Sequence, residues 1–147
     1  MAEAFSNKLV RAAGSVQTST GCTIGITTTN ILGVSTAGLN VGDLVDNQNF
    51  IAGTKIATIG VGSIFANRDS TNTASSSGNS VKFLGVTTAY SSASSVKSII
   101  IGGTFANNTN NQVSLSVVVE DNSTGTDVAL ASKIPVPAGS SFVISDT

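Results

Sequence analysis

A chain of 147 residues is long enough to bury a hydrophobic core, and 40% of its residues are hydrophobic while only 10% are charged. Disordered chains have the opposite balance, so this composition, in which Ser and Thr supply about a quarter of the residues, predicts an ordered all-β protein with a neutral polar surface. The net charge of -1 and the scattered basic residues argue against a nucleic-acid partner, and the lack of an apolar run of about 20 residues argues against a membrane span.

Residues 1–20 are predicted to form an N-terminal arm, because only Phe5 and Leu9 fall at helical spacing before Gly14. A single helical turn is the alternative for this segment. The segment also lacks the basic start and the continuous apolar core of a signal peptide. We therefore expect synthesis in a cytoplasm without export by a cleaved signal.

Residues 21–68 contain short apolar runs separated by glycine-bearing turns, which predict a small β module, either a barrel or a tight meander. Cys22, Ile24 and Ile26 alternate along its first strand. Because Cys22 is the only cysteine, no intrachain disulfide can form, and we expect a half-buried strand residue in preference to a reactive thiol. Residues 69–80, "DSTNTASSSGNS", contain no large apolar side chain and are predicted to be a flexible linker or a long loop that marks a domain boundary.

Residues 81–147 are predicted to form a small antiparallel β-sandwich, of the immunoglobulin or jelly-roll type. Its expected strands are "SVKFLGVTTAY", "SVKSIIIGGTF", "QVSLSVVVED", "VALASKI" and "FVISD". Within residues 99–121, the two arms are predicted to pair through a turn at 107–111, and Val and Leu alternate with Ser along the second arm. Pro135 and Pro137 cannot donate to a ladder, so we expect them at an edge or a strand end.

Side chains that support catalysis are scarce. The chain has no histidine, and its acids are Glu3, Asp43, Asp46, Asp69, Glu120, Asp121, Asp127 and Asp146. Glu120 and Asp121 are neighbours at a strand end, which favours a solvated turn over a glycosidase pair. Asp43 and Asp46 are three residues apart in a strand and would point to opposite faces, which disfavours a shared cation. We therefore expect no catalytic, cofactor-binding or metal site and no enzymatic activity.

Two further motifs are interpreted as turns or connections. The glycosylation sequons at 107–109 and 122–124 are interpreted as turns, because a chain without a signal peptide would not meet the glycosylation machinery. The glycine pairs are not followed by Gly-Lys-Ser or Gly-Lys-Thr, so they do not predict a phosphate loop.

Three segments, "AFSNKLVRAAGSV", "GVTTAYSSASSVKSIIIGGTFANNTNNQVSLSVVVED" and "ASKIPVPAGSSFVI", together resemble a family of virion structural proteins from tailed phages of marine cyanobacteria. Residues 106–109 and 136–141 stand where that family has an "ANT"-like turn and a "VPAGSS" turn. The resemblance covers residues 1–20 and 81–147 and implies a small β-sandwich used as a virion part, without catalytic residues. Residues 21–80 depart from the family pattern and correspond to an insertion or an added β module.

A second departure is that the family usually continues past the strand that follows "VPAGSS". Either a partner chain completes the sheet or the protein as made is longer. We expect the apolar edge formed by "FVISDT" to be covered by another chain.

These observations predict a bacteriophage virion structural protein, either a capsid decoration or cement protein or a neck or tail component. Its partners would be other virion proteins and copies of itself, because a surface with few charges is readily buried in a homo-oligomer. The alternative is a carbohydrate-binding β module of a receptor-binding tail fibre. Sugar platforms generally use exposed Trp or Tyr, whereas this chain has no Trp and a single tyrosine, Tyr90.

Overall fold

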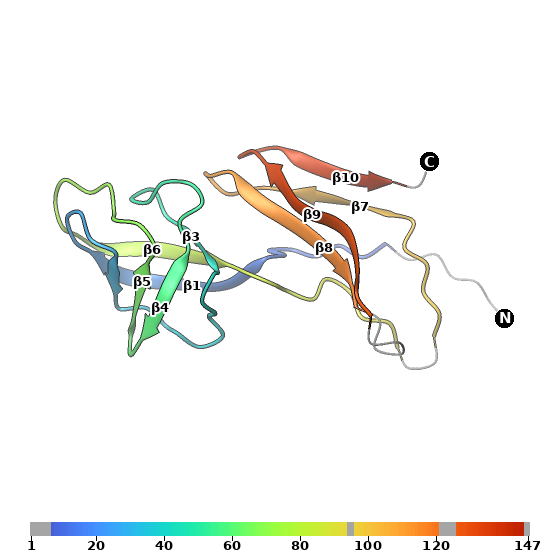
Figure 1. Ribbon diagram of the computed structural model, residues 1–147, viewed down its shortest axis with the longest axis horizontal. Helices are drawn as coiled ribbons and strands as arrows, with labels where there is room; N and C mark the ends of the chain where they lie inside the picture. Colours follow the sequence, from blue (N-terminus) through green and yellow to red (C-terminus); the bar gives the residue numbers. More distant parts are fainter. Residues whose placement is uncertain (1–6, 94–95, 121–125, 146–147) are drawn as a thin grey trace.

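The computed structural model describes residues 7–93, 96–120 and 126–145. Within these ranges the fold is all-β, every strand pair is antiparallel and no residue is helical, which confirms the predicted fold class. The strands are β1 (Ser15–Ile24), β2 (Asn30–Leu32), β3 (Leu44–Asp46), β4 (Ile56–Gly60), β5 (Ser63–Ala66), β6 (Ser76–Leu84), β7 (Gly102–Ala106), β8 (Val113–Val119), β9 (Val128–Val136) and β10 (Ser141–Ser145). Figure 1 shows an elongated molecule with β1–β6 gathered at one end and β7–β10 at the other. The described residues include no helix that is long and apolar enough to cross a membrane.

Residues 15–84 form a six-stranded sheet in the order β3-β6-β1-β2-β5-β4. The two ends of this sheet are joined, because the Val45 N–H donates to the Thr54 carbonyl at 2.9 Å and the Ile56 N–H donates to the Asp43 carbonyl at 2.8 Å. A sheet that closes on itself leaves little free edge for other chains. We call residues 15–84 the barrel unit, and its closure agrees with the barrel that the short apolar runs predicted.

The hydrophobic core lies inside the barrel unit. Its buried members are Cys22, Ile24, Ile31, Val34, Leu39, Val45, Phe50, Ile56, Ile64, Ala66, Val81 and Phe83. The long strands β1 and β6 supply four of these residues, and their pairing shifts register between Ser19 and Cys22. Gly21 lies at this shift with a φ of 76°, a conformation that favours glycine. Such a bulge increases the local twist and lets a long strand curve around a small core.

The predicted linker at 69–80 is wrong. Strand β6 begins at Ser76 and pairs with β1, and Asn79 lies opposite Cys22 in that ladder. The residues before β6 are also docked, because Ser70 is buried and its hydroxyl donates to the Gly25 carbonyl at 2.8 Å. Short polar side chains hold this segment against the barrel unit through hydrogen bonds to backbone groups. The segment is therefore docked although it has no large apolar side chain.

The other predicted boundaries also move, because strands β1 and β6 extend across them. Strand β1 begins at Ser15, so the part of the predicted arm at residues 15–20 belongs to the barrel unit. Residues 81–84 complete β6 and belong there too, with Val81 and Phe83 fully buried. The two units are therefore divided after Leu84.

Residues 102–120 and 126–145 form the C-terminal unit, which contains two two-stranded sheets, β10-β7 and β8-β9. The hairpin predicted within residues 99–121 is wrong, since β7 pairs with β10 and β8 pairs with β9. The predicted alternation along β8 is confirmed, because its odd-numbered residues are half-buried and its even-numbered residues are exposed. Pro135 lies near the end of β9, whose described sheet contains only one other strand, as expected for an edge.

Asn107 connects the two sheets of the C-terminal unit. Its side-chain nitrogen donates to the carbonyls of Asn111 at 2.8 Å and Val136 at 2.9 Å. Its backbone N–H donates to the Ser140 carbonyl at 2.8 Å, and its own carbonyl accepts from the Gly139 N–H at 2.9 Å. The first sequon therefore lies in a turn, as predicted, with Asn107 buried and Asn108 exposed, while the prediction for 122–124 falls outside the described residues.

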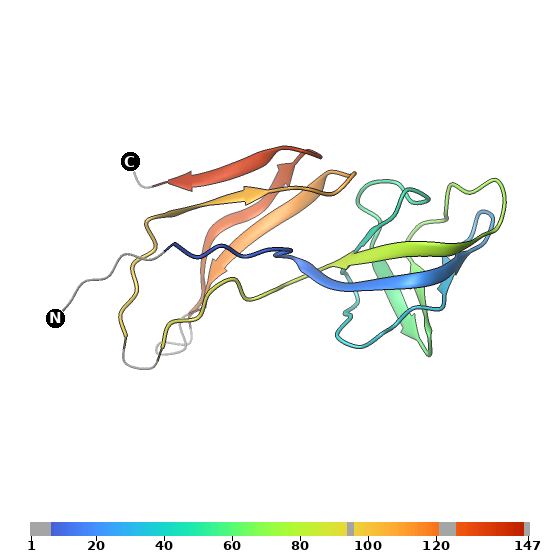
Figure 2. The same ribbon diagram turned by 180° about the vertical axis from the view of Figure 1, so that it is seen from behind.

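Residues 85–93 and 96–101, here called the connecting segment, join the two units. Both stretches are outside the strands, although "SVKFLGVTTAY" and "SVKSIIIGGTF" were predicted to be strands along their length. Figure 2 shows the first stretch running beside the N-terminal residues. The Gly85 N–H donates to the Gly14 carbonyl at 2.8 Å, and the Gly14 N–H donates to the Thr87 hydroxyl at 2.7 Å.

Candidate functional site

Asp43 and Asp46, the two acids considered above as ligands of a shared cation, bind different partners. Asp43 is buried, and its carboxylate accepts from the Asn40 N–H at 2.8 Å. The Asp46 carboxylate instead accepts from the side-chain nitrogen of Asn111 at 3.1 Å. Within the described ranges, no group of three His, Cys, Asp or Glu side chains is placed to hold a metal ion. Asp43 thus closes a turn, and Asp46 joins the two units.

The remaining acids are exposed or outside the described residues. Glu120, Asp69 and Asp127 are exposed. Glu3, Asp121 and Asp146 lie outside the described ranges, so the geometry of the neighbouring pair at 120–121 is not defined.

Cys22 lies inside the barrel unit and is fully buried, more completely than the half-buried position predicted. Its Sγ lies 3.6 Å from the carbonyl oxygens of both Ser19 and Gly33. Burial raises the pKa of the Cys22 thiol above its ordinary value. A protonated, enclosed thiol is a poor nucleophile, so the geometry supports a packing role.

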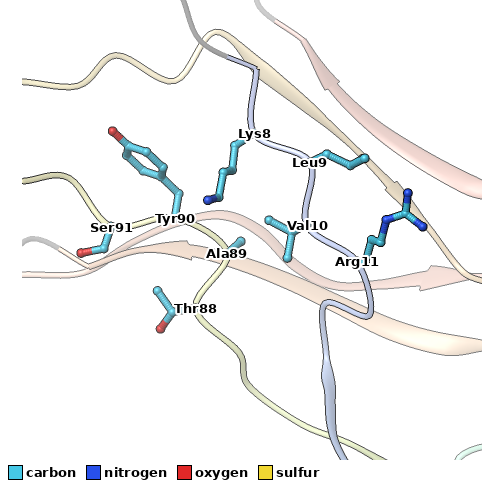
Figure 3. A pocket seen from close by; sticks show the side chains of 8 residues that line it. All are labelled: Lys8, Leu9, Val10, Arg11, Thr88, Ala89, Tyr90 and Ser91. Carbon is cyan, nitrogen blue, oxygen red and sulfur yellow. The ribbon is translucent and has the colours of Figure 1, made fainter.

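An open hollow of about 580 Å³ lies along the seam between the N-terminal residues and the connecting segment. Its lining residues are Lys8, Leu9, Val10, Arg11, Thr88, Ala89, Tyr90 and Ser91. Figure 3 shows Lys8 and Val10 directed toward the stretch that carries Tyr90, while Arg11 is directed away from it. The Tyr90 hydroxyl is 3.1 Å from the Ser98 hydroxyl. The side chains do not converge on one point, so this hollow is a seam between two extended segments.

A second hollow, of about 390 Å³, is rich in amides and lies where the barrel unit meets the 107–111 turn. Its lining residues are Asp46, Asn47, Gln48, Gly78, Asn79, Ser80, Lys82 and Asn110. Two of the amides are structural, because Asn47 donates to the Ser80 carbonyl at 2.9 Å and Asn79 donates to the Cys22 carbonyl at 3.3 Å. We call this site the amide hollow. The sequence did not reveal it, because its members come from three separate segments.

Large aliphatic side chains are exposed along the connecting segment and the C-terminal unit. The exposed large aliphatic residues of the connecting segment and the C-terminal unit are Val86, Val96, Ile99, Ile100, Ile101, Val118, Val128, Leu130 and Val143. We call these residues the exposed apolar set. In the described part of the C-terminal unit only Ala131 and Val136 are buried apolar residues, against twelve in the barrel core. Single exposed aliphatic residues are common, but a unit with so few buried ones is not.

The total accessible surface agrees with this imbalance. It is 9851 Å², whereas a compact monomer of 14.7 kDa exposes about 6,900 Å². The excess is about 2,900 Å², and complete exposure of the residues outside the described ranges would supply at most about 2,200 Å². The described residues therefore carry part of the excess themselves.

No family model, curated protein or solved structure matches this chain. The exposed apolar set and the amide hollow are therefore the two candidate sites that the described surface offers. The first was visible in the sequence as an apolar run, "IIIGG", although the sequence assigned it to a paired hairpin arm. The second depends on tertiary contacts alone.

Proposed function

We propose that this chain is a structural assembly subunit, and specifically a bacteriophage virion protein that acts through protein–protein contacts as a capsid decoration or cement protein or a neck or tail component. The observation that carries the proposal is the exposed apolar set, which leaves the C-terminal unit without a closed core of its own. A partner surface would supply the missing cover.

Burial of the exposed apolar set against a partner would contribute a large favourable free energy of association. Burying apolar surface stabilises by roughly 25 cal/mol per Å², and a fully buried isoleucine side chain contributes about 1.5–3 kcal/mol. The described residues carry at least about 700 Å² of excess surface, which is comparable with the roughly 800 Å² that each partner buries in an interface of standard size. With 10% charged residues, few charges need to be desolvated at the contact.

The two units suit different parts of this role. The barrel unit buries its own core and has its sheet ends joined, so it can stand as a self-contained module. Residues 1–20 and 81–147 carry the resemblance to virion structural proteins, and the whole exposed apolar set lies within residues 81–147. The virion assignment rests on that resemblance, and the assembly role rests on the surface.

Two measurements test this proposal together. Mass spectrometry of purified phage particles whose genome encodes the chain should find it at a copy number comparable with that of other structural proteins. Sedimentation velocity of the purified chain, or of the chain mixed with isolated particles, should show a higher mass than the monomer. Absence of the chain from washed particles would overturn the virion role.

The amide hollow favours a second candidate, a carbohydrate-binding module of a receptor-binding fibre. Gln48, Lys82 and Asn110 line it with polar groups that can bond to sugar hydroxyls. Glycan-array binding that is lost in Gln48→Ala and Lys82→Ala, but retained in Lys55→Ala, which removes a lysine that does not line the hollow, would support this candidate. The hollow contains no aromatic platform, which is why we place assembly first.

A further inference from the structure

The barrel unit and the C-terminal unit are joined through two neighbouring stretches of chain. Just beyond the end of the β1-β6 ladder, the Gly85 N–H donates to the Gly14 carbonyl at 2.8 Å, and the Gly14 N–H donates to the Thr87 hydroxyl at 2.7 Å. We call residues 12–14 and 85–87 the junction. Figure 2 shows both stretches leaving the barrel unit side by side toward the C-terminal unit.

The side chains of the junction are exposed, and part of its backbone is left-handed. Ala12, Val86 and Thr87 are exposed, and Val86 is 93% exposed. The φ angles of Ala12 and Gly14 are 55° and 79°. Hinges consist of a few residues at the ends of elements that absorb changes in backbone angles, and segments with few buried contacts yield most easily. The junction meets both conditions.

A second contact between the two units is small and polar. Of the hydrogen bonds among the described residues, one joins the barrel unit to the C-terminal unit, from the side-chain nitrogen of Asn111 to the Asp46 carboxylate at 3.1 Å. The amide hollow lies at the same contact, since its lining includes Asp46 from the barrel unit and Asn110 from the 107–111 turn. The hydrophobic core cluster consists of barrel residues alone. Small polar contacts between units of one chain permit relative motion.

We propose that the C-terminal unit rotates as a body about the junction, and that the Asp46–Asn111 hydrogen bond is a latch that holds the closed arrangement. In the open arrangement this bond is broken, both side chains are solvated and the amide hollow is wider. One protein hydrogen bond is exchanged for bonds to water, so the two arrangements differ little in free energy. Asn107 bonds to the end of β9, which helps the two sheets of the C-terminal unit to move together.

This inference does not rest on the proposed function, because it concerns motion within one chain. It adds to the assembly role a joint that sets the angle at which the exposed apolar set is presented to a partner. A partner that binds one arrangement better would shift the population toward it by the difference in affinity.

The variant Asn111→Ala removes the latch and keeps the turn that carries it. The Asn111 carbonyl accepts from the Asn107 side-chain nitrogen and from the Thr109 hydroxyl, both at 2.8 Å, and the Asn111 N–H donates to the Thr109 hydroxyl at 3.3 Å. These are backbone groups of residue 111, so alanine retains them. The matched control is Asn108→Ala, which truncates an exposed asparagine of the same turn.

Distances between two spin labels give the first test. The labels are placed at Lys55→Cys in the barrel unit and at Ser114→Cys on β8, both exposed positions, while the enclosed Cys22 stays unlabelled. Double electron–electron resonance should show one dominant distance in the chain with the latch. Asn111→Ala should add a second distance and lower the ratio of closed to open molecules at least about fivefold. Asn108→Ala should leave the distribution unchanged.

Residual dipolar couplings of the unlabelled chain give the second test. With the latch intact, one alignment tensor should fit the N–H couplings of β1–β6 and of β7–β10. In Asn111→Ala each unit should still fit a tensor of its own, while a common tensor should fail. Couplings of β7–β10 that fall toward zero in this variant would show unfolding in place of rotation and would overturn the inference.

The remaining outcomes are equally decisive. An Asn111→Ala chain with the same single distance and the same common tensor as the unmodified chain overturns the latch. An unmodified chain that already shows both distances in the variant's proportions overturns it too, because the bond then holds nothing. Asp46→Ala should reproduce the effect of Asn111→Ala, and the double variant should add nothing to it. None of these results bears on the proposed function, which depends on the presence of the chain in particles and on its mass in sedimentation.

Discussion

The side-chain nitrogen of Asn111 donates a hydrogen bond to the carboxylate of Asp46 across 3.1 Å, and this bond links the C-terminal unit to the barrel unit. The two residues are 65 positions apart in the chain. Asp46 ends β3, and Asn111 precedes β8 in the turn that Asn107 organises. A single charge-assisted hydrogen bond of this kind constrains how the two units are oriented, but it does not determine the fold of either unit.

The first prediction concerns this bond. Asp46→Ala should lower the free energy of unfolding by about 1 kcal/mol, because Asn111 loses its acceptor at a partly buried site. Asp46→Asn keeps a side-chain oxygen and should change stability by less than about 0.5 kcal/mol. Denaturant unfolding of both variants is the measurement. Equal losses in the two would show that the charge, and not the acceptor, matters.

Truncation of an apolar side chain should affect the free energy of unfolding differently in the barrel unit and in the connecting segment. Phe83 is fully buried in the barrel unit, so Phe83→Ala should cost about 3–5 kcal/mol in the isolated chain. Ile101 is 56% exposed, so Ile101→Ala should cost less than about 1 kcal/mol in the monomer. The same Ile101 change should weaken association measurably. A large loss of monomer stability in Ile101→Ala would mean that this side chain is already packed within its own chain.

Limited proteolysis with trypsin should cut the connecting segment before it cuts the barrel unit. Lys97 is exposed and outside the strands, whereas Lys82 lies within the β1-β6 ladder. Trypsin should therefore cleave the diluted monomer after Lys97 before it cleaves after Lys82 or Arg68. Mass spectrometry of the early fragments identifies the site. Early cleavage after Arg68, at the start of the 69–80 stretch, would restore the linker that the structure rejects.

Cys22 should make stability depend on alkaline pH. Burial raises its pKa above the ordinary value of 9.0, so the folded chain holds the thiol proton where the unfolded chain has lost it. The resulting contribution is fully present below pH 9.0 and is lost as the pH rises through the raised pKa of the folded chain. The stability difference between the unmodified chain and Cys22→Ala should therefore shrink above this pH.

The control for this pH effect is chemical. Iodoacetamide should leave Cys22 unmodified in the folded chain at neutral pH and should alkylate it after unfolding in denaturant, because Sγ is enclosed. Rapid alkylation under native conditions would show that the barrel unit opens on the timescale of the reaction. In that case the pH dependence would report the open form.

The amide hollow and the C-terminal pairing show where sequence patterns stop being informative. The alternation along β8 correctly indicated one half-buried face, but it could not indicate which strand pairs with β8. Adjacent arms with a turn between them favour a hairpin, but here β7 pairs with β10 and β8 pairs with β9, and the buried Asn107 between the two arms bonds to the end of β9. The hollow was missed because Asp46, Asn79 and Asn110 meet only after folding.

The sequence by itself determined the all-β class and the alternation along β8, because period-two alternation and glycine-bearing turns are local properties of the chain. It left the choice between a barrel and a tight meander open, and it predicted only half burial for Cys22. Only the tertiary structure decided that the polar stretch at 69–80 belongs to the barrel unit, that β7 pairs with β10, and that Ile99 to Ile101 lie exposed. These outcomes depend on which distant segments compete for the same backbone hydrogen bonds and the same apolar surface. The outcome of that competition depends on the whole fold and cannot be derived from a local sequence pattern.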